Sequence, residues 1–70
     1  MSTTTGSALP RLLRLPEVLK ITGLSKAALY RATAAGTFPK PVKLTERSSA
    51  WVAGEVETWI HQRIESRSAA

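Results

Sequence analysis

The chain has 70 residues and therefore forms one domain at most. A domain of this size buries only a small core, and an enclosed active-site cavity of the usual ~300–1,000 Å³ would be hard to form in it, which disfavours an enzyme. The formal net charge is +5 and the isoelectric point is about 10.5, with seven basic residues and one acid between Arg11 and Lys43. Such a one-sided distribution is typical of proteins that bind a polyanion, but many small soluble proteins are basic as well, so charge alone leaves both interpretations open. The absence of cysteine excludes disulfides and thiolate sites and fits an intracellular protein.

The two ends of the chain differ in composition from its middle. Residues 1–10 are rich in serine, threonine, glycine and alanine and are expected to form a disordered leader. They lack the basic start and the apolar core of a secretory signal. No apolar run approaches the ~20 residues that a membrane-spanning helix needs. Residues 66–70 are expected to form a flexible tail, which leaves 11–65 as the folded domain.

The first predicted element is a short helix that begins near Pro16. Proline suits the first turn of a helix, where its missing N–H group is not needed. Glu17 lies near the positive end of the helix dipole, and Gly23 is expected to end the helix. The residues at helical spacing are Leu15, Val18, Leu19 and Thr22, with Ile21 beside them.

A second helix is predicted over residues 26–35, with Ser25 as its N-cap and Gly36 at its end. At about 100° per residue, Ala28, Leu29 and Ala32 share the inward face. The opposite face carries Lys26, Ala27, Tyr30, Arg31 and Ala34. Because the inward residues are small apart from Leu29, this helix can approach its neighbour closely.

A basic hairpin follows the second helix. The prolines on either side of Lys40 exclude a helix there. Val42 and Leu44, at alternating positions, predict a short strand, and a polar turn leads to a return strand over residues 50–52. Trp51 is expected to face the core beside Val42 and Leu44.

The last predicted element is an amphipathic helix over residues 54–65. Its apolar residues recur at helical spacing: Val56, Trp59, Ile60 and Ile64. Trp51 and Trp59 both lie on faces that must be buried, so they are interpreted as core residues and not as platforms for stacking bases.

This order of elements predicts a fold that is mainly α with a small β-hairpin: a winged helix-turn-helix, in the order helix, helix, hairpin, helix. In a helix-turn-helix the second helix lies in the major groove, with its N-terminal residues on the base edges. Ser25 and Lys26 occupy that N-terminus, and Tyr30 and Arg31 follow on the same face. Lys40, Lys43 and Arg47 would reach the backbone or the neighbouring minor groove from the hairpin, which forms the wing.

Residues 13–64 resemble the AlpA family of phage regulatory proteins, which belong with the excisionase-like and MerR-like winged-helix DNA-binding domains. The resemblance rests on "GLS" followed by "LYR", on "FPKPVKL", and on a tryptophan followed by "EV" and a second tryptophan. It implies a protein without catalysis that binds double-stranded DNA, regulating a promoter or helping a phage integrase to excise DNA. It also implies a cytoplasmic bacterial protein, associated with the nucleoid when bound.

Carried over by position, the family's recognition helix includes Ser25, Lys26, Tyr30 and Arg31, and the base of its wing includes Lys40 and Lys43. The chain departs from the family at Ala27 and Ala28, where members often carry polar residues. These alanines leave fewer hydrogen-bond donors for base edges, although Ala27 can contact a thymine methyl group. Glu46 in the wing would repel a phosphate unless Arg47 masks it.

Several alternatives remain open. One is an excisionase-type factor that bends DNA beside an integrase; another is an adaptor that binds a protein through an exposed apolar stripe on the Trp59 helix. Arg11 and Arg14 are equally compatible with a DNA-contacting arm and with plain solvation. His61 has no partner ligand and there is no nucleophile–base pair, so no metal, cofactor or catalytic site is expected. Because so small a domain reads few base pairs, two copies on repeated sites are expected.

Overall fold

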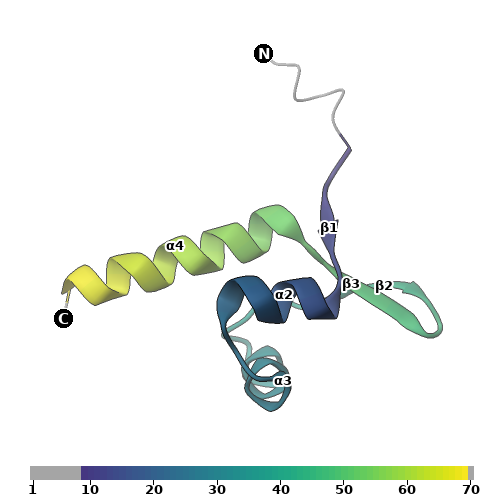
Figure 1. The fold of residues 1–70 in the computed structure, drawn as a ribbon, viewed down its shortest axis with the longest axis horizontal. Coiled ribbons are helices and arrows are strands. Elements are labelled where there is room, and N and C mark those ends of the chain that lie inside the picture. Colours follow the sequence, from purple (N-terminus) through teal and green to yellow (C-terminus); the bar gives the residue numbers. More distant parts are fainter. Residues whose placement is uncertain (1–8, 70) are drawn as a thin grey trace.

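A computed structural model describes residues 9–69 and shows three helices and a small antiparallel sheet (Figure 1). In chain order the elements are β1 (Leu12–Leu13), α2 (Leu15–Thr22), α3 (Lys26–Ala35), β2 (Val42–Thr45), β3 (Ser48–Val52) and α4 (Ala53–Ala69). This arrangement is that of a winged helix-turn-helix, as predicted. Most of the predicted leader lies outside the described residues.

The two helices of the helix-turn-helix begin and end where the sequence predicts. Pro16 is in the first turn of α2, and Gly23 ends this helix with φ of 75°, a left-handed conformation that glycine adopts without strain. The N–H group of Gly23 donates to the carbonyl oxygen of Leu19 at 2.9 Å. The connection to α3 is therefore tight, which holds the two helices in a fixed relation.

α3 places its small residues inward. Leu29 is fully buried, and Ala28 and Ala32 are partly buried. Gly36 ends the helix with φ of 83°, and the N–H of Thr37 donates to the carbonyl oxygen of Ala32 at 2.9 Å. The predicted inward face is confirmed.

The sheet contains a strand that the sequence did not predict. The strand order is β1-β3-β2, and β1 pairs antiparallel with β3, placing Leu12 opposite Val52 and Leu13 opposite Trp51. The N–H of Ala53 also donates to the carbonyl oxygen of Arg11 at 2.8 Å. The segment before α2 is thus fixed to the start of α4 and is not a free arm.

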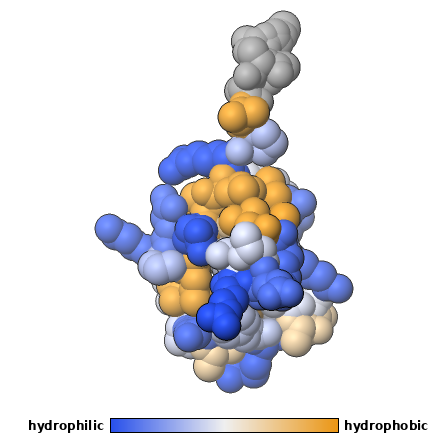
Figure 2. Space-filling model, turned by 90° about the vertical axis from the view of Figure 1, so that its right-hand side faces the viewer, coloured by the Kyte–Doolittle hydropathy of each residue, from blue (hydrophilic) through white to orange (hydrophobic). Residues whose placement is uncertain are grey.

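The two faces of the sheet correct one prediction about Trp51. Trp51 is buried with Leu13, but Val42 and Leu44 remain 42% and 44% exposed. Val42 pairs with Ala50, whose side chain points to the opposite face from Trp51 because side chains alternate along a strand. The expectation that Trp51 lies beside Val42 and Leu44 is therefore wrong, since β1 supplies its cross-strand partner. Figure 2 shows apolar residues gathered on the side of the molecule that carries the hairpin.

One cluster of buried side chains joins all three helices to the sheet. Its members are Leu13, Val18, Leu29, Phe38, Trp51, Ala53 and Val56. The indole N–H of Trp51 donates to the carbonyl oxygen of Pro39 at 3.0 Å, which satisfies the one polar atom of this side chain. The predicted core role of Trp51 is confirmed.

α4 is longer than predicted and leaves the core along its length (Figure 1). Val56 is fully buried, Trp59 and Ile60 are partly buried, and Ile64 is 46% exposed. The helix continues past residue 65 to Ala69, so residues 66–69 are helical, whereas the flexibility of the tail stays a prediction. None of the helices within residues 9–69 has the length and apolar character needed to cross a membrane.

Candidate nucleic-acid interface

The outward face of α3 presents polar and basic side chains to solvent. Lys26, Ala27 and Arg31 are exposed, and Tyr30 is 47% exposed. The helix contains no acidic residue. The structure therefore brings four of the predicted site residues onto one accessible face; their contacts with DNA stay predictions.

Ser25 has a structural role at the start of this face. Its hydroxyl oxygen accepts a hydrogen bond from the N–H of Ala28 at 3.1 Å, which caps α3. The hydroxyl hydrogen remains able to donate, because the cap uses only a lone pair of the oxygen. Ser25 is exposed, so the same side chain can cap the helix and meet a ligand.

The hairpin turns one basic residue toward the helices. Lys43 pairs with Ser49, and Ser49 lies two positions before Trp51, so the side chains of Lys43 and Ser49 share the face of the sheet on which Trp51 is buried. The register shifts between Lys43 and Thr45, an irregularity that bends the hairpin. Arg47 lies in the turn, where its N–H donates to the side-chain oxygen of Thr45 at 3.2 Å.

A cleft of about 430 Å³ lies between the start of α2, the outward face of α3 and the hairpin. We call it the arginine cleft; its lining residues are Arg14, Leu15, Pro16, Tyr30, Arg47 and Ser49. Two predicted site residues, Tyr30 and Arg47, thus come together. Sequence reasoning missed Ser49 and left Arg14 undecided, because nothing local in the sequence connects either of them with Tyr30.

Arg11 and Arg14 have different surroundings although both flank β1. The guanidinium of Arg11 pairs with the carboxylate of Glu17 at 3.5 Å, and both side chains are substantially exposed. This is the only ion pair within residues 9–69, so Arg14 and Arg47 form none with the described part of the chain. The cations of the arginine cleft are therefore not neutralised by a carboxylate of the described chain.

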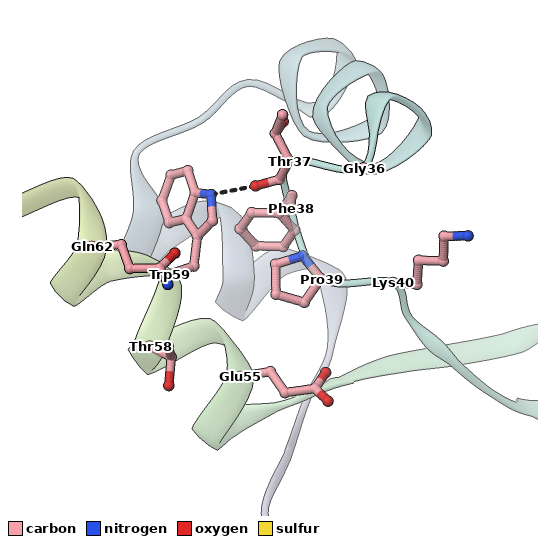
Figure 3. Close-up of a pocket in the computed structure, with 9 residues that line it drawn as sticks. All are labelled: Gly36, Thr37, Phe38, Pro39, Lys40, Glu55, Thr58, Trp59 and Gln62. Atoms are coloured by element: carbon pink, nitrogen blue, oxygen red, sulfur yellow. Dashed lines mark hydrogen bonds between the residues drawn. The ribbon is translucent and has the colours of Figure 1, made fainter. Parts of the chain in front are cut away.

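A second hollow, of about 530 Å³, lies between the segment after α3 and the first turns of α4 (Figure 3). We call it the aromatic groove. Phe38 and Trp59 meet edge-on with ring centroids 4.9 Å apart, and the indole N–H of Trp59 donates to the carbonyl oxygen of Thr37 at 2.9 Å. Lys40 lines this groove and not the arginine cleft, and Figure 3 shows its side chain directed away from the two rings.

The aromatic groove bears on the predicted role of Trp59. The indole is partly buried, bonded to Thr37, and covered on one face by the guanidinium of Arg63, which lies 5.2 Å from the ring centroid. Trp59 thus packs against the core, as predicted, but also borders solvent. The exposed side chain of Ile64 is compatible with the adaptor alternative. The contacts of Trp59 within the chain weaken that alternative, because it requires this side chain to be available to a partner.

The acidic and histidine side chains within residues 9–69 do not form a cluster that could bind a metal ion. Within residues 9–69, no group of three or more histidine, cysteine, aspartate or glutamate side chains could hold a metal ion. His61 is exposed on α4.

Comparison with known proteins identifies relatives of the chain. The sequence model of the family described as "Prophage CP4-57 regulatory protein (AlpA)" matches residues 11–64. Over 57 residues the chain is 40% identical to "Uncharacterized protein ORF88" of Enterobacteria phage P4, covering 81% of this chain and 65% of that protein, just under two thirds of its length. Over 59 residues it is 36% identical to "DNA-binding transcriptional activator AlpA" of Escherichia coli (strain K12), covering 76% of this chain and 84% of the relative. The resemblance inferred from the sequence is confirmed.

Proposed function

The chain belongs to the AlpA family of prophage regulatory proteins, and we propose that it binds double-stranded DNA and regulates transcription of phage or other mobile-element genes. In this proposal α3 enters the major groove and the hairpin contacts the backbone or the neighbouring minor groove. The name of the E. coli relative, a DNA-binding transcriptional activator, supports the choice of partner. The protein acts without catalysis, in the bacterial cytoplasm, on the nucleoid.

The observation that carries the proposal is the excess of positive charge between the start of α2 and the turn of the wing. Between Glu17 and Glu46 the chain has no acidic residue and five basic ones: Lys20, Lys26, Arg31, Lys40 and Lys43. The exposed face of α3 adjoins the arginine cleft through Tyr30, and Arg47 of the hairpin lines the same cleft, so the recognition helix and the wing meet there. A duplex, with a phosphate on each strand along its length, is the polyanion that such an extended surface fits.

Within this proposal the residues have distinct tasks. The first turn of α3, with Ser25, Lys26 and Ala27, meets the base edges, whereas Tyr30 and Arg31 contact the flanking backbone. The side chain of Ala27, which is exposed in the first turn, provides no hydrogen bond to a base, so part of the sequence preference comes from the shape and deformability of the site.

The test is duplex binding measured by fluorescence anisotropy over a range of KCl concentrations. The logarithm of the affinity should fall linearly with the logarithm of the salt concentration, by about 0.9 per neutralised phosphate. Selection of bound duplexes from random DNA should then return a short motif, present twice if two copies bind repeated sites. Binding that does not change with salt would contradict the proposal.

A second candidate within the same fold is an excisionase-type factor that bends DNA for a phage integrase. The observation that favours it is Ala27, an exposed residue in the first turn of the recognition helix whose side chain offers no hydrogen bond to a base edge, which suits recognition by deformation more than by base contacts. A circular-permutation assay separates the two: strong bending at the selected site, with a cooperative response to integrase, supports excision, whereas unbent complexes support regulation alone.

A further inference from the structure

The arginine cleft is assembled from four separate parts of the chain. Arg14 is the N-cap residue of α2, and Tyr30 comes from the outward face of α3. Arg47 comes from the turn of the hairpin and Ser49 from β3. Because helix, recognition helix and wing all contribute, a ligand held here would fix the hairpin against the helix-turn-helix.

The polar groups that line the cleft are suited to an anion. Two guanidinium groups and two hydroxyl groups can all donate hydrogen bonds, and no carboxylate lines the cleft. Glu17, the acid nearest to Arg14 in the sequence, is paired with Arg11. Glu46 adjoins Arg47 in the chain but neither lines the cleft nor forms an ion pair within residues 9–69.

The chemistry of the guanidinium group indicates which class of anion the cleft would bind. Each guanidinium offers a planar fork of N–H groups that matches two oxygens of a phosphate, and arginine keeps its charge throughout the physiological pH range. Leu15, which is partly buried, and Pro16 also line the cleft, and this apolar part of the lining strengthens a contact between charges. A phosphate group with two unesterified oxygens can therefore accept from Arg14 on one side and Arg47 on the other.

The position of the cleft identifies the source of that phosphate. Tyr30 belongs both to the outward face of α3 and to the lining of the cleft, and Lys43 is the cross-strand partner of Ser49. A DNA strand that passes from the recognition helix to the wing therefore crosses the cleft, next to the first helix, which crosses the backbone in helix-turn-helix complexes.

We propose that the arginine cleft clamps one internucleotide phosphate of duplex DNA between Arg14 and Arg47, with the hydroxyls of Tyr30 and Ser49 as further donors. The proposal rests on the proposed function and adds to it a specific phosphate contact and a residue, Arg14, that lies outside the recognition helix and the wing. Its task is positioning: it fixes the angle between α3 and the hairpin on the DNA and does not read sequence.

A clamp on one phosphate and two independent phosphate contacts predict different salt slopes for the variant that lacks both arginines. If both arginines hold the same phosphate, the double variant Arg14→Gln with Arg47→Gln loses one neutralised phosphate, and the salt slope falls by about 0.9 in total. If each arginine holds its own phosphate, the slope falls by about 1.8. The double variant therefore distinguishes a clamp from two separate contacts.

The experiment compares the wild-type protein, the two single variants and the double variant by anisotropy on one labelled duplex over a range of KCl concentrations. Arg67→Gln is the matched control, because it removes the same charge from the far end of α4. Arg14→Lys is a second variant of the clamp: it keeps the charge and loses the fork, so the slope should remain while the affinity falls. Thermal melting followed by circular dichroism checks that each variant is folded.

The expected result is weaker binding by Arg14→Gln and by Arg47→Gln, a slope reduced by about 0.9 in the double variant, and no change in the control. Three outcomes would overturn the clamp: both variants matching Arg67→Gln, a slope that falls by about 1.8, or saturable binding of inorganic phosphate alone with unchanged DNA slopes. Absence of salt-dependent duplex binding by the wild-type protein would instead overturn the proposed function, and the clamp with it.

Discussion

The two hollows of this molecule have similar volumes and opposite chemistry. In the aromatic groove, the indole N–H of Trp59 is already bonded to the carbonyl oxygen of Thr37, and Lys40 and Glu55 bring charges of opposite sign to its edge. Two arginines line the arginine cleft, and no carboxylate does. The indole N–H of the groove is bonded within the chain, whereas the guanidinium groups of the cleft form no ion pair within residues 9–69 and are open to an anion.

This difference indicates a division of labour between the two sides of a very small domain. The side that includes Phe38 and Trp59 supplies packing between α3, α4 and the sheet. The side that includes Arg31 and the arginine cleft supplies charge at the surface. A substitution on the first side should therefore change the free energy of unfolding, and one on the second side should change the affinity for DNA.

The largest effect is expected for Phe38→Ala. Phe38 is 2% exposed and packs edge-on against Trp59, so its removal leaves a cavity that costs about 3–5 kcal/mol of stability. Because a small domain has only about 5–15 kcal/mol in total, this loss should lower the melting temperature severely. Urea or thermal unfolding followed by circular dichroism measures it.

The control for Phe38→Ala is Leu44→Ala, which removes a half-exposed side chain of β2 and should cost much less. At a temperature where Phe38→Ala is still folded, its salt slope on duplex DNA should equal that of the wild-type protein. A reduced slope in the folded variant would mean that the groove side also contacts DNA.

The next effect in size is expected for Arg31→Glu. Arg31 is exposed on the outward face of α3, and reversing its charge replaces attraction to the backbone with repulsion. Duplex affinity should fall at least about tenfold, the scale of a lost arginine contact. Anisotropy on the same labelled duplex measures the change.

Arg67→Glu is the matched control for this reversal, since the change in net charge is the same at the other end of the molecule. Both variants should melt like the wild-type protein. Equal losses of affinity would show that only net charge matters, and the distinction between the two sides would fail.

Helices and strands could be predicted from the sequence where neighbouring residues alone determine their ends. α2 and α3 could be bounded from Pro16, Ser25 and two glycines, because caps and left-handed turns depend on neighbouring residues alone. β1 could not be predicted: two residues carry no periodicity, and this strand exists because β3 is available to pair with it. The error about Trp51 has the same origin, since its partner Leu13 comes from the unpredicted strand.

The candidate site also has one part that could be predicted from the sequence and one part that could not. The exposed face of α3 follows from helical spacing and was predictable. The arginine cleft was not, because Arg14, Tyr30 and Arg47 are far apart in the sequence and meet only when β1 fixes the start of α2 against the sheet. Lys40 was placed at the base of the wing by its charge and by its position in the family pattern, and in the fold it lines the aromatic groove, a contact that neither signal indicates.

Smaller effects are expected for two substitutions of Ser25, one that lowers the stability of the fold and one that lowers the affinity for DNA. Ser25→Ala removes the hydrogen bond to the N–H of Ala28 and should cost about 1 kcal/mol of stability. Ser25→Asp keeps a capping oxygen and should melt close to the wild-type protein, but it places a negative charge where α3 meets DNA. Unfolding and duplex binding are measured on both variants.

Ser66→Ala, an exposed serine on α4, is the control for the loss of the hydroxyl group. The expected pattern is a stability loss for Ser25→Ala and an affinity loss for Ser25→Asp. If Ser25→Asp bound the duplex as tightly as the wild-type protein, the N-terminus of α3 would not approach phosphates or bases.

The smallest effect is expected for His61→Ala. His61 is exposed on α4 and forms no ion pair within residues 9–69, so its removal should change the free energy of unfolding by less than about 0.5 kcal/mol. It lines neither the arginine cleft nor the aromatic groove, and duplex affinity should be unchanged. This null result is informative because α4 extends away from the helix-turn-helix. A clear loss of affinity in His61→Ala would mean that DNA also reaches α4, and the charged surface would then have to wrap a longer path than α3 and the hairpin provide.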